Sequence, residues 1–249
     1  MKVSIITATY NSASSIKTAI DSVLSQTHHN LEYLIIDGAS IDDTLALAAS
    51  YHDPRIRILS ESDSGIYDAL NKGISAATGD VIGFVHSDDL LAGTTVVEEL
   101  VAHLADGADG VYGDLLYVEK EDTSKVIRYW KSRPFYRKLL SRGWMPAHPT
   151  LFLKSEVYQK HGNFSVQYQI AADYDLMLRI FSDSSLNFAY LPKVITKMRV
   201  GGASNRSLKS LLVKSKEDYH VLKRNNLKLP FKILLYKNLS KVGQFIKKS

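Results

Sequence analysis

The first 116 residues alternate between two patterns of hydrophobic and polar positions. Short apolar runs typical of strands occur at Val3–Thr9, Tyr33–Asp37, Arg55–Leu59, Val81–His86 and Gly110–Leu116. Between them, apolar residues recur at helical spacing within Ser14–Gln26, Asp42–Tyr51, Gly65–Ala77 and Thr94–Ala105. Strands and helices that alternate in this way form βαβ units. The pattern therefore predicts an α/β fold built on a doubly wound, mainly parallel sheet.

The pattern is less regular after about residue 116. A basic, aromatic stretch runs from Arg128 to Lys138, and a turn follows at Trp144–Pro146. We therefore expect one domain over residues 1–205, with a regular half at 1–116 and a less regular half at 117–205. Residues 206–249 form a tail of different composition.

Composition narrows the class of protein. Of the 249 residues, 45% are hydrophobic and 23% are charged, which is typical of a globular chain with a full core. The absence of cysteine excludes disulfides and thiolate metal sites and fits a reducing compartment. The chain enters a strand pattern directly after Met1, without the pattern of a signal peptide, and no apolar run could span a bilayer. We therefore expect a cytoplasmic protein.

The tail differs from the body in charge. Residues 206–249 contain twelve Lys and Arg against Glu217 and Asp218, whereas the first 205 residues contain 19 basic and 24 acidic residues. Apolar residues mark one face of Leu208–Leu222 and one face of Phe231–Lys248. For the first helix we expect packing on the domain. For the second we expect binding to an anionic membrane surface, with packing on the domain and solvated lysines as the alternative. The acidic body and the absence of a nucleic-acid-binding motif indicate no nucleic-acid partner.

Familiar nucleotide-binding loops are missing. The chain has neither Gly-x-Gly-x-x-Gly after its first strand nor a Gly-x-x-x-x-Gly-Lys-Ser/Thr loop, and its eight His show no zinc-site spacing. The first turn reads Thr7-Ala8-Thr9-Tyr10-Asn11. A nucleotide bound there would be held by side chains and a metal.

Two adjacent carboxylates follow the apolar run Val81–His86, in the sequence Ser87-Asp88-Asp89. Ligands of open α/β sheets bind at the carboxyl ends of the strands. One or two carboxylates suffice to hold Mg²⁺ or Mn²⁺ when substrate phosphates complete the coordination. The alternative is a solvated turn in which one Asp caps the next helix.

Four segments fall at carboxyl ends of predicted strands: Thr7–Asn11, Asp37–Thr44, Glu61–Gly73 and His86–Asp89. Together they resemble the family 2 glycosyltransferases of the GT-A fold, especially bacterial enzymes of surface-polysaccharide and O-antigen assembly. The resemblance covers the first ninety residues closely and the rest loosely. It implies a GT-A domain over residues 1–205, with a nucleotide-sugar-binding half at 1–116, an acceptor-binding half at 117–205 and a basic helical tail at 206–249.

The resemblance implies a donor site at these segments. Its residues would be Thr7, Thr9, Tyr10, Asn11, Asp37, Asp68, Asn71, Lys72, Asp88 and His148. Tyr10 would stack on the nucleobase, and Asp37 would accept from the imide N–H of uracil, which points to a UDP-sugar. Asp89 would be the ligand of Mn²⁺ or Mg²⁺.

Several of these residues have structural alternatives. Asp37 could cap a turn, although Asp42 or Asp43 better fits that role beside Thr44. Asp68 and Lys72 could form a helix pair. His148 could contact the diphosphate or the acceptor, and the role of His86, where the family often has Asn or Asp, stays open.

Sugar transfer to a hydroxyl requires a base. The family places it at the start of a helix in the second half, which corresponds to Asp173, with Asp175 as a rival because Ala172 replaces the usual acidic partner. Residues two apart on a helix point in different directions, so only one of the two can face the cleft. Arg179 fits a structural ion pair.

The sequence thus predicts a metal-dependent, inverting glycosyltransferase of the hexosyl- or N-acetylhexosaminyl-transferring type. It would transfer a sugar from a UDP-sugar to a hydroxyl of a saccharide carried on a lipid such as polyprenyl diphosphate. It would act as a peripheral protein on the inner face of the plasma membrane. The alternative is a catalytically inactive, membrane-associated scaffold of the same fold. Whether the chain forms a homo-oligomer stays open.

Overall fold

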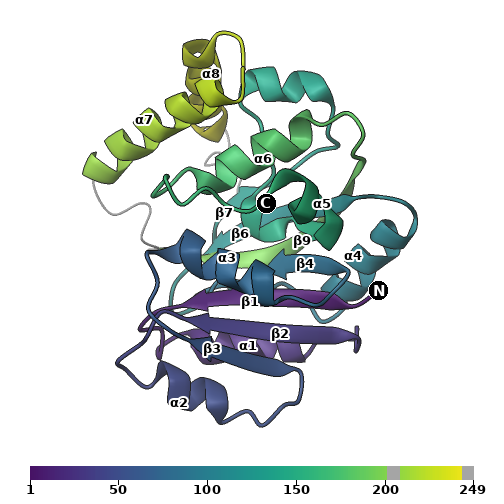
Figure 1. Ribbon diagram of the computed structural model, residues 1–249, viewed down its shortest axis with the longest axis vertical. Helices are drawn as coiled ribbons and strands as arrows, with labels where there is room; N and C mark the ends of the chain where they lie inside the picture. The colour runs from purple at the N-terminus through teal and green to yellow at the C-terminus, as the bar shows by residue number, and fades with distance from the viewer. Residues whose placement is uncertain (201–207, 243–249) are drawn as a thin grey trace.

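The computed structural model describes residues 1–200 and 208–242, and these form a mixed sheet flanked by helices (Figure 1). The strand order is β3-β2-β1-β4-β8-β6-β9-β5, and β7 pairs with the C-terminal part of β6, Leu115–Val118. The strands are β1 Val3–Thr9, β2 Leu31–Asp37, β3 Ile56–Ser60, β4 Val81–Phe84, β5 Leu90–Leu91, β6 Gly110–Val118, β7 Val126–Trp130, β8 Phe152–Lys154 and β9 Phe188–Arg199. The predicted α/β class is confirmed.

The helices also agree with the apolar spacing of the sequence. The α-helices are α1 Ile16–Leu24, α2 Thr44–Ala49, α3 Ile66–Ala76, α4 Val96–Ala105, α5 Ser155–His161, α6 Ala172–Ser182, α7 Leu208–Arg224 and α8 Pro230–Val242. Short 3₁₀ helices are η1 Arg137–Arg142 and η2 His148–Thr150.

The sheet changes character in the middle. Strands β3, β2, β1 and β4 are parallel, as the alternating pattern predicts. Beyond β4, strand β8 is antiparallel to both β4 and β6, whereas β6 and β9 are parallel. The mixed half corresponds to the part of the chain where the strand and helix alternation is lost.

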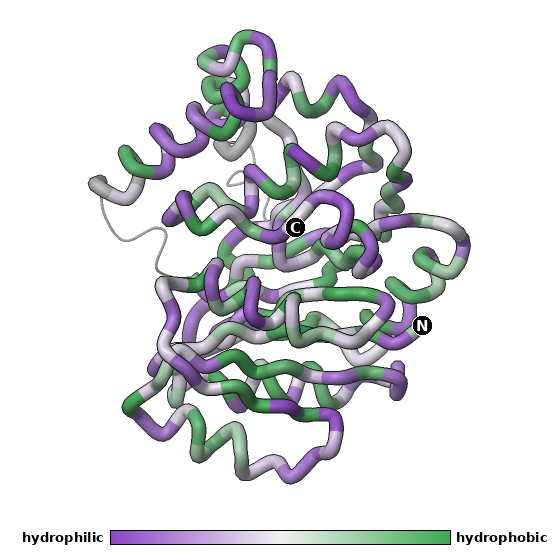
Figure 2. The backbone as a smooth tube through the Cα atoms, in the orientation of Figure 1, coloured by the Kyte–Doolittle hydropathy of each residue, from purple (hydrophilic) through white to green (hydrophobic). Residues whose placement is uncertain are grey.

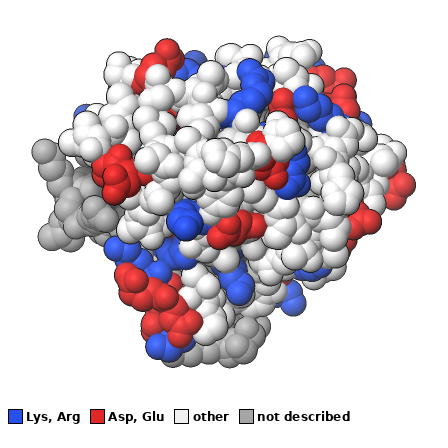
Figure 3. Space-filling view, turned by 90° about the horizontal axis from the view of Figure 1, so that it is seen from below, with Lys and Arg blue, Asp and Glu red and all other residues white. Residues whose placement is uncertain are grey.

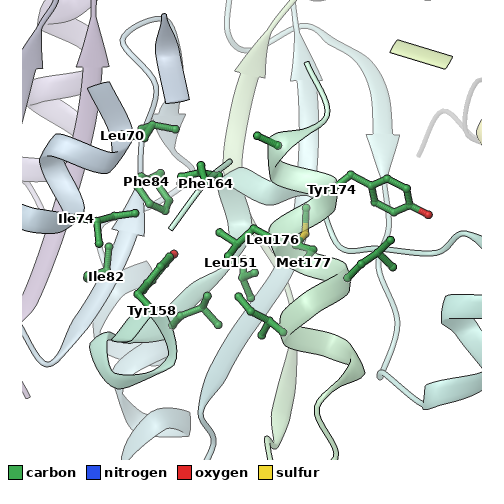
Figure 4. Packing of buried hydrophobic residues seen from close by; sticks show 14 of the residues in the cluster. Leu70, Ile74, Ile82, Phe84, Leu151, Tyr158, Phe164, Tyr174, Leu176 and Met177 are labelled. Atoms are coloured by element: carbon green, nitrogen blue, oxygen red, sulfur yellow. The ribbon is translucent and has the colours of Figure 1, made fainter. Parts of the chain in front are cut away.

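Two apolar clusters cover the two faces of the sheet. One contains residues of α1, α2 and α4. The other contains residues of α3, α5 and α6, and Figure 4 shows Leu70 and Phe84 in it across from Leu176 and Met177. Figure 2 shows the hydrophobic residues concentrated along the central strands. Burial on both faces explains the nearly continuous apolar runs of β1 and β2.

Helices α7 and α8 lie beyond α6 on the same side of the sheet (Figure 1). Val221, Leu222 and Ile233 are buried there, so the predicted packing of 208–222 on the domain is confirmed. Helix α8 also packs on the domain, but Phe231, Leu235 and Leu239 remain exposed on its other face. The rest of the predicted second tail helix, residues 243–249, lies outside the described residues.

Candidate active site

The carboxyl ends of β1 and β2 lie side by side because Thr9 pairs with Asp37 in the parallel register. Asp37 is fully buried and accepts hydrogen bonds from the Ser40 N–H at 3.0 Å, the Ser40 hydroxyl and the Ser60 hydroxyl. Thr9 Oγ1 is buried without a hydrogen-bond partner among the described residues. Asp37 therefore closes the turn after β2, while its bond to a uracil ring stays a prediction.

Asn11 joins the loop after β1 to the loop after β2. Its N–H donates to Ser40 Oγ at 2.8 Å, and its Oδ1 accepts from the Ile41 N–H at 3.0 Å. Its φ of 48° is a left-handed conformation that Asn tolerates better than most residues. Thr7 lies beneath these loops with no exposed surface, and its hydroxyl bonds Val85 O and Tyr33 Oη.

Tyr10 is the exposed aromatic side chain at this edge, with 62% of its surface accessible. Gly38 lies beside it: a Cβ at Gly38 would make an ordinary contact with the Tyr10 ring at 3.5 Å but would clash with Asp63 Oδ2 at 2.5 Å. A larger residue at 38 would therefore displace the Asp63 side chain. An exposed ring beside a backbone without a side chain is a surface on which a flat base can stack.

The three predicted residues of α3 have different surroundings. Asn71 exchanges two hydrogen bonds with the backbone of Phe164, at 2.9 and 3.0 Å, so its amide links α3 to the second half. Lys72 lies 3.0 Å from Glu61 and 3.9 Å from Asp68 and donates to Ser62 O. The ion pair between Asp68 and Lys72, expected as the structural alternative, is thus present, but it is longer than the pair between Glu61 and Lys72. Asp68 Oδ2 accepts from the Ser64 N–H.

The loop after β4 carries Asp88 and Asp89. Asp89 is fully buried, and its Oδ1 accepts from the Arg199 N–H at the end of β9, at 3.2 Å. Arg199 Nη1 donates to Asp88 O at 2.7 Å, and Ser87 Oγ lies 2.9 Å from Ser12 Oγ of the loop after β1. The carboxylate pair is therefore held between the two halves of the sheet.

The donor set around Asp89 fits a divalent cation. Its Oδ2 is buried without a hydrogen-bond partner in the described residues, an arrangement that is costly for a carboxylate unless it has a ligand. Burial, and then the neighbouring Asp88 charge, raises the pKa of Asp89 well above its ordinary value. Residues 1–200 and 208–242 contain no group of three or more His, Asp or Glu arranged as a metal site. A cation at Asp89 would thus take most of its ligands from substrate and water.

His148 and His86 lie behind the carboxylate loop with their ring centroids 6.1 Å apart. His148 is 8% exposed and packs between Phe84 and Phe164. Burial lowers the pKa of His148 to about 3, so the ring is neutral. Its Nε2 and the Nδ1 of His86 are buried without hydrogen-bond partners among the described residues. Both rings are neutral because burial also lowers the pKa of His86.

The two candidate bases on α6 differ in their partners. Asp175 is 1% exposed, pairs with Arg179 at 3.0 Å and accepts from Asn225 Nδ2 at 3.0 Å. Arg179 is thus the structural ion-pair partner that the sequence suggested. Asp173 Oδ1 accepts from the Tyr174 N–H at 2.7 Å, and burial raises the pKa of Asp173. Asp175 is thus occupied by structural partners, while the role of Asp173 as the base stays a prediction.

Sequence reasoning missed Tyr117 and Arg128 on the β6–β7 hairpin. The Arg128 guanidinium lies 4.8 Å from the Tyr117 ring centroid and 5.5 Å from that of Trp130. Burial raises the pKa of Tyr117, and the charges of both Asp89 and Asp173 add to this effect. Tyr117 therefore lies within electrostatic reach of both carboxylates. The aromatic and basic composition of the stretch was visible, but its pairing with β6 was not.

A comparison with protein families finds a match to the model described as "Glycosyl transferase family 2" over residues 4–162. The chain is 30% identical over 208 residues to a "PGL/p-HBAD biosynthesis glycosyltransferase" of Mycobacterium bovis (strain BCG / Pasteur 1173P2), an alignment that covers 81% of this chain and 78% of the relative. It is 27% identical over 267 residues to an uncharacterized glycosyltransferase of Rickettsia prowazekii, covering 99% of this chain and 80% of that protein.

Solved structures share the fold. Residues 1–349 of S. aureus TarS in complex with UDP-GlcNAc match with a TM-score of 0.71 at 16% identity, covering 90% of this chain and 65% of that one. The mannosyltransferase PcManGT of Pyrobaculum calidifontis, in complex with GDP-Man and Mn²⁺, matches with a TM-score of 0.66 at 21% identity, covering 95% and 68%. This chain thus spans less than two thirds of the TarS fragment.

Proposed function

Because this chain belongs to the family 2 glycosyltransferases, we propose that it is an inverting enzyme that transfers a sugar from a UDP-sugar to a hydroxyl of a lipid-linked saccharide. The observation that carries the proposal is the buried Asp89, whose Oδ2 lacks a partner among the described residues. The loop that carries Asp89 contacts the loop after β1, which carries Tyr10, through Ser87 and Ser12. The TarS structure with UDP-GlcNAc supports a nucleotide-sugar site at this edge. Uridine is favoured by the position of Asp37.

Each residue has a chemical task in this proposal. Tyr10 stacks on the base, and Asp89 with Asp88 holds Mn²⁺ or Mg²⁺. The cation, when bound, neutralises negative charge on the diphosphate. Asp173 accepts the proton of the acceptor hydroxyl while the acceptor oxygen forms a bond to the anomeric carbon. The bond from that carbon to the diphosphate oxygen breaks, and UDP leaves with the electron pair. One displacement inverts the configuration at the anomeric carbon.

Burial suits Asp173 to this task. A base with a raised pKa holds the transferred proton more tightly, and a base typically contributes about 10²–10⁴-fold to the rate. Asp175 is less suited to this task, because its oxygens are occupied by Arg179 and Asn225.

Binding of UDP with Mn²⁺ tests the donor site. We expect UDP with Mn²⁺ to raise the melting temperature of the wild-type chain, by the equivalent of about 2.7 kcal/mol when free UDP is 100 times its Kd. The variant Asp89→Asn should lose the Mn²⁺-dependent part of the shift. Asp43→Asn, at an exposed residue without a capping bond, is the matched control and should keep it. An unchanged shift in Asp89→Asn contradicts the assignment of the metal ligand.

Transfer itself is tested with a panel of UDP-sugars and polyprenyl-diphosphate saccharides, with UDP release as the readout. We expect Mn²⁺-dependent release that requires the acceptor, and a product of inverted configuration by NMR. UDP-sugar binding without turnover on any acceptor of the panel favours the inactive scaffold instead.

We also propose that α8 holds the enzyme on the inner face of the plasma membrane. Phe231, Leu235 and Leu239 recur every four residues and are 74%, 52% and 58% exposed, so they form a continuous apolar stripe. The exposed Lys228 and Lys232 complement anionic lipid headgroups. In the described parts of the chain, no helix has the length and hydropathy needed to cross a bilayer.

Vesicle sedimentation tests this surface. The double variant Phe231→Ser/Leu235→Ser should bind vesicles containing phosphatidylglycerol at least tenfold more weakly than wild type. Ile41→Ser removes an even more exposed apolar side chain, 90% accessible, near α2 and should bind normally. Figure 3 shows that the face at the α2 end mixes acidic and basic side chains, which makes it a suitable control surface. Equal binding of all three proteins refutes the anchoring.

A further inference from the structure

The two acidic residues of the basic tail both face the domain. Glu217 and Asp218 are adjacent on α7, which packs against α6 (Figure 1). Asp218 is 2% exposed. A tail that served only as a basic surface would not need a buried carboxylate at this place. Their contacts lead to the first turn of α6, which carries Asp173.

Glu217 binds the backbone of the loop that leads into α6. Its Oε1 accepts from the Gln169 N–H, and its Oε2 accepts from the N–H groups of Ile170 and Ala171, each at 2.9 Å. Ala171 is the residue before α6 and offers no capping side chain of its own. These N–H groups precede the helix, and a carboxylate at this end of α6 interacts favourably with the helix dipole. Glu217 thus fixes the backbone two residues before Asp173.

The opposite side of the same loop is also held. Tyr67 of α3 donates its hydroxyl to Ile170 O at 2.6 Å. The peptide units before α6 are therefore bound through their N–H groups by α7 and through a carbonyl by α3. Without the Glu217 side chain, only the bond from the Tyr67 hydroxyl to Ile170 O remains of these two restraints.

Lys237 of α8 brings a buried positive charge to the same region. Its Nζ lies 2.9 Å from Asp218 Oδ1 and 3.2 Å from the ring centroid of Tyr174, the residue that follows Asp173. Both side chains of the ion pair are nearly inaccessible, at 6% and 4%. Figure 4 shows Tyr174 pointing away from Phe84 and Phe164. The Tyr174 ring thus faces the C-terminal helices, where Lys237 covers it.

Charged and titratable groups from four elements act on Asp173. They are Tyr67 from α3, Tyr117 from β6, Lys214 and Asp218 from α7, and Lys237 from α8. Burial raises the pKa of Asp173, Lys237 and Lys214 oppose this rise, and Asp218 adds to it. The tail thus contributes both attraction and repulsion to the carboxylate.

We propose that Glu217 and Lys237 are positioning residues of the active centre: Glu217 fixes the backbone that leads into α6, and Lys237, paired with Asp218 and seated over the Tyr174 ring, holds a buried charge next to Asp173. The C-terminal helices therefore complete the acceptor side of the site. The inference rests on the proposed function of Asp173 as the base.

Opposite shifts of the pH profile test the electrostatic part. Removing a positive charge raises the pKa of Asp173, and removing a negative charge lowers it. In transfer assays, Lys237→Met should move the acid limb of kcat to higher pH and Asp218→Asn to lower pH, each by about half a unit or more. Lys232→Met, at an exposed lysine on the same helix, should leave the limb in place. A purely structural role lowers activity in both variants and leaves both limbs unmoved.

Two further variants keep the test usable if Lys237→Met does not fold. Lys237→Arg preserves the charge and should keep the wild-type limb, and Lys214→Met removes a partly exposed charge without breaking the buried pair and should move the limb to higher pH. Two results overturn the electrostatic part. One is an acid limb that stays in place in Lys214→Met. The other is an acid limb in Lys237→Arg that shifts by as many pH units as the limb of Lys214→Met.

The positional part is tested by Glu217→Ala and Glu217→Gln. We expect Glu217→Ala to lower kcat by up to about 100-fold, because small displacements of a catalytic group are costly, with the Kd of UDP and Mn²⁺ unchanged. Glu217→Gln keeps one oxygen acceptor and should recover part of the loss. Equal kcat in Glu217→Ala and wild type overturns this part. Wild-type activity in Asp173→Asn instead refutes the proposed base, whereas an inactive Asp173→Asn with unmoved limbs in the tail variants refutes only the present inference.

Discussion

Glu32, at the start of β2, links β2 to β1 and to the turn that precedes β4, the strand that Asp88 and Asp89 follow. It accepts hydrogen bonds from the Ser4 hydroxyl of β1, from the Thr78 N–H and hydroxyl at 2.6 and 2.7 Å, and from Lys2 Nζ at 3.0 Å. Thr78 lies in the turn that leads into β4. The side chain of Glu32 is 7% exposed, so these bonds are shielded from water.

The pKa of Glu32 gives the size of this contribution. Burial alone raises the pKa, but the bonds from Ser4, Thr78 and Lys2 outweigh it and lower the pKa from 4.5 to about 2. At about 1.4 kcal/mol for each pKa unit, ionised Glu32 stabilises the fold by about 3 kcal/mol at neutral pH. Because the native pKa lies below the unfolded one, this stability is complete above about pH 5 and is lost as the pH falls towards 2. At pH 3.5, about 1.4 kcal/mol of it is lost.

Urea unfolding of the wild type and Glu32→Gln, at pH 7 and at pH 3.5, measures this loss. The variant should be less stable by about 3 kcal/mol at pH 7, and the difference should narrow by about 1.4 kcal/mol at pH 3.5. The control Glu121→Gln, at an exposed residue of the β6–β7 turn, should differ from wild type by the same amount at both pH values. A constant or wider difference for Glu32→Gln refutes the reasoning.

Three further predictions concern the site and its support. Gly83→Ala should lower the free energy of unfolding by about 1–3 kcal/mol, since the new Cβ would lie 2.1 Å from Phe152 Cε1, and an unchanged urea midpoint contradicts the tight β4–β8 approach. Asp175→Asn should lower the melting temperature, because it weakens a buried pair, while Asp173→Asn should keep the melting temperature and lower kcat by about 10²–10⁴-fold. If Asp173→Asn instead lowers the melting temperature and Asp175→Asn lowers only kcat, Asp175 is the base and Asp173 the structural residue. Tyr10→Ala should weaken UDP binding by about tenfold in calorimetry, and full affinity argues against stacking.

The places of the candidate donor-site residues in the fold could be predicted because they are local to strand ends. The strand and helix ranges expected in the first 116 residues agree with the structure to within a few residues, and Val3–Thr9 agrees at both ends, whereas the two-residue strand β5 was not expected. A parallel sheet brings the carboxyl ends of its strands to one edge, so Asp37 and Asp89 could be assigned to the same region from their places in sequence.

Residues whose role depends on distant partners could not be predicted in this way. Asn71 looks like a third polar residue on the face of Asp68, but its amide is bonded to the backbone of Phe164, 93 residues further along the chain. The apolar residues of α8 predict one amphipathic helix, yet its inner face buries Ile233 and Lys237 while the outer stripe stays exposed.

The sequence by itself determined the fold class, the family and the cluster of donor-side motifs, because hydrophobic period and strand ends are local properties of the chain. Only the tertiary structure showed that Asp175 is tied to Arg179 and Asn225 and that Glu217, one of two acidic residues in a basic tail, binds the loop before α6. The physical reason is that a pattern shows which side of an element is apolar, but the partner of a buried carboxylate depends on which element packs against it.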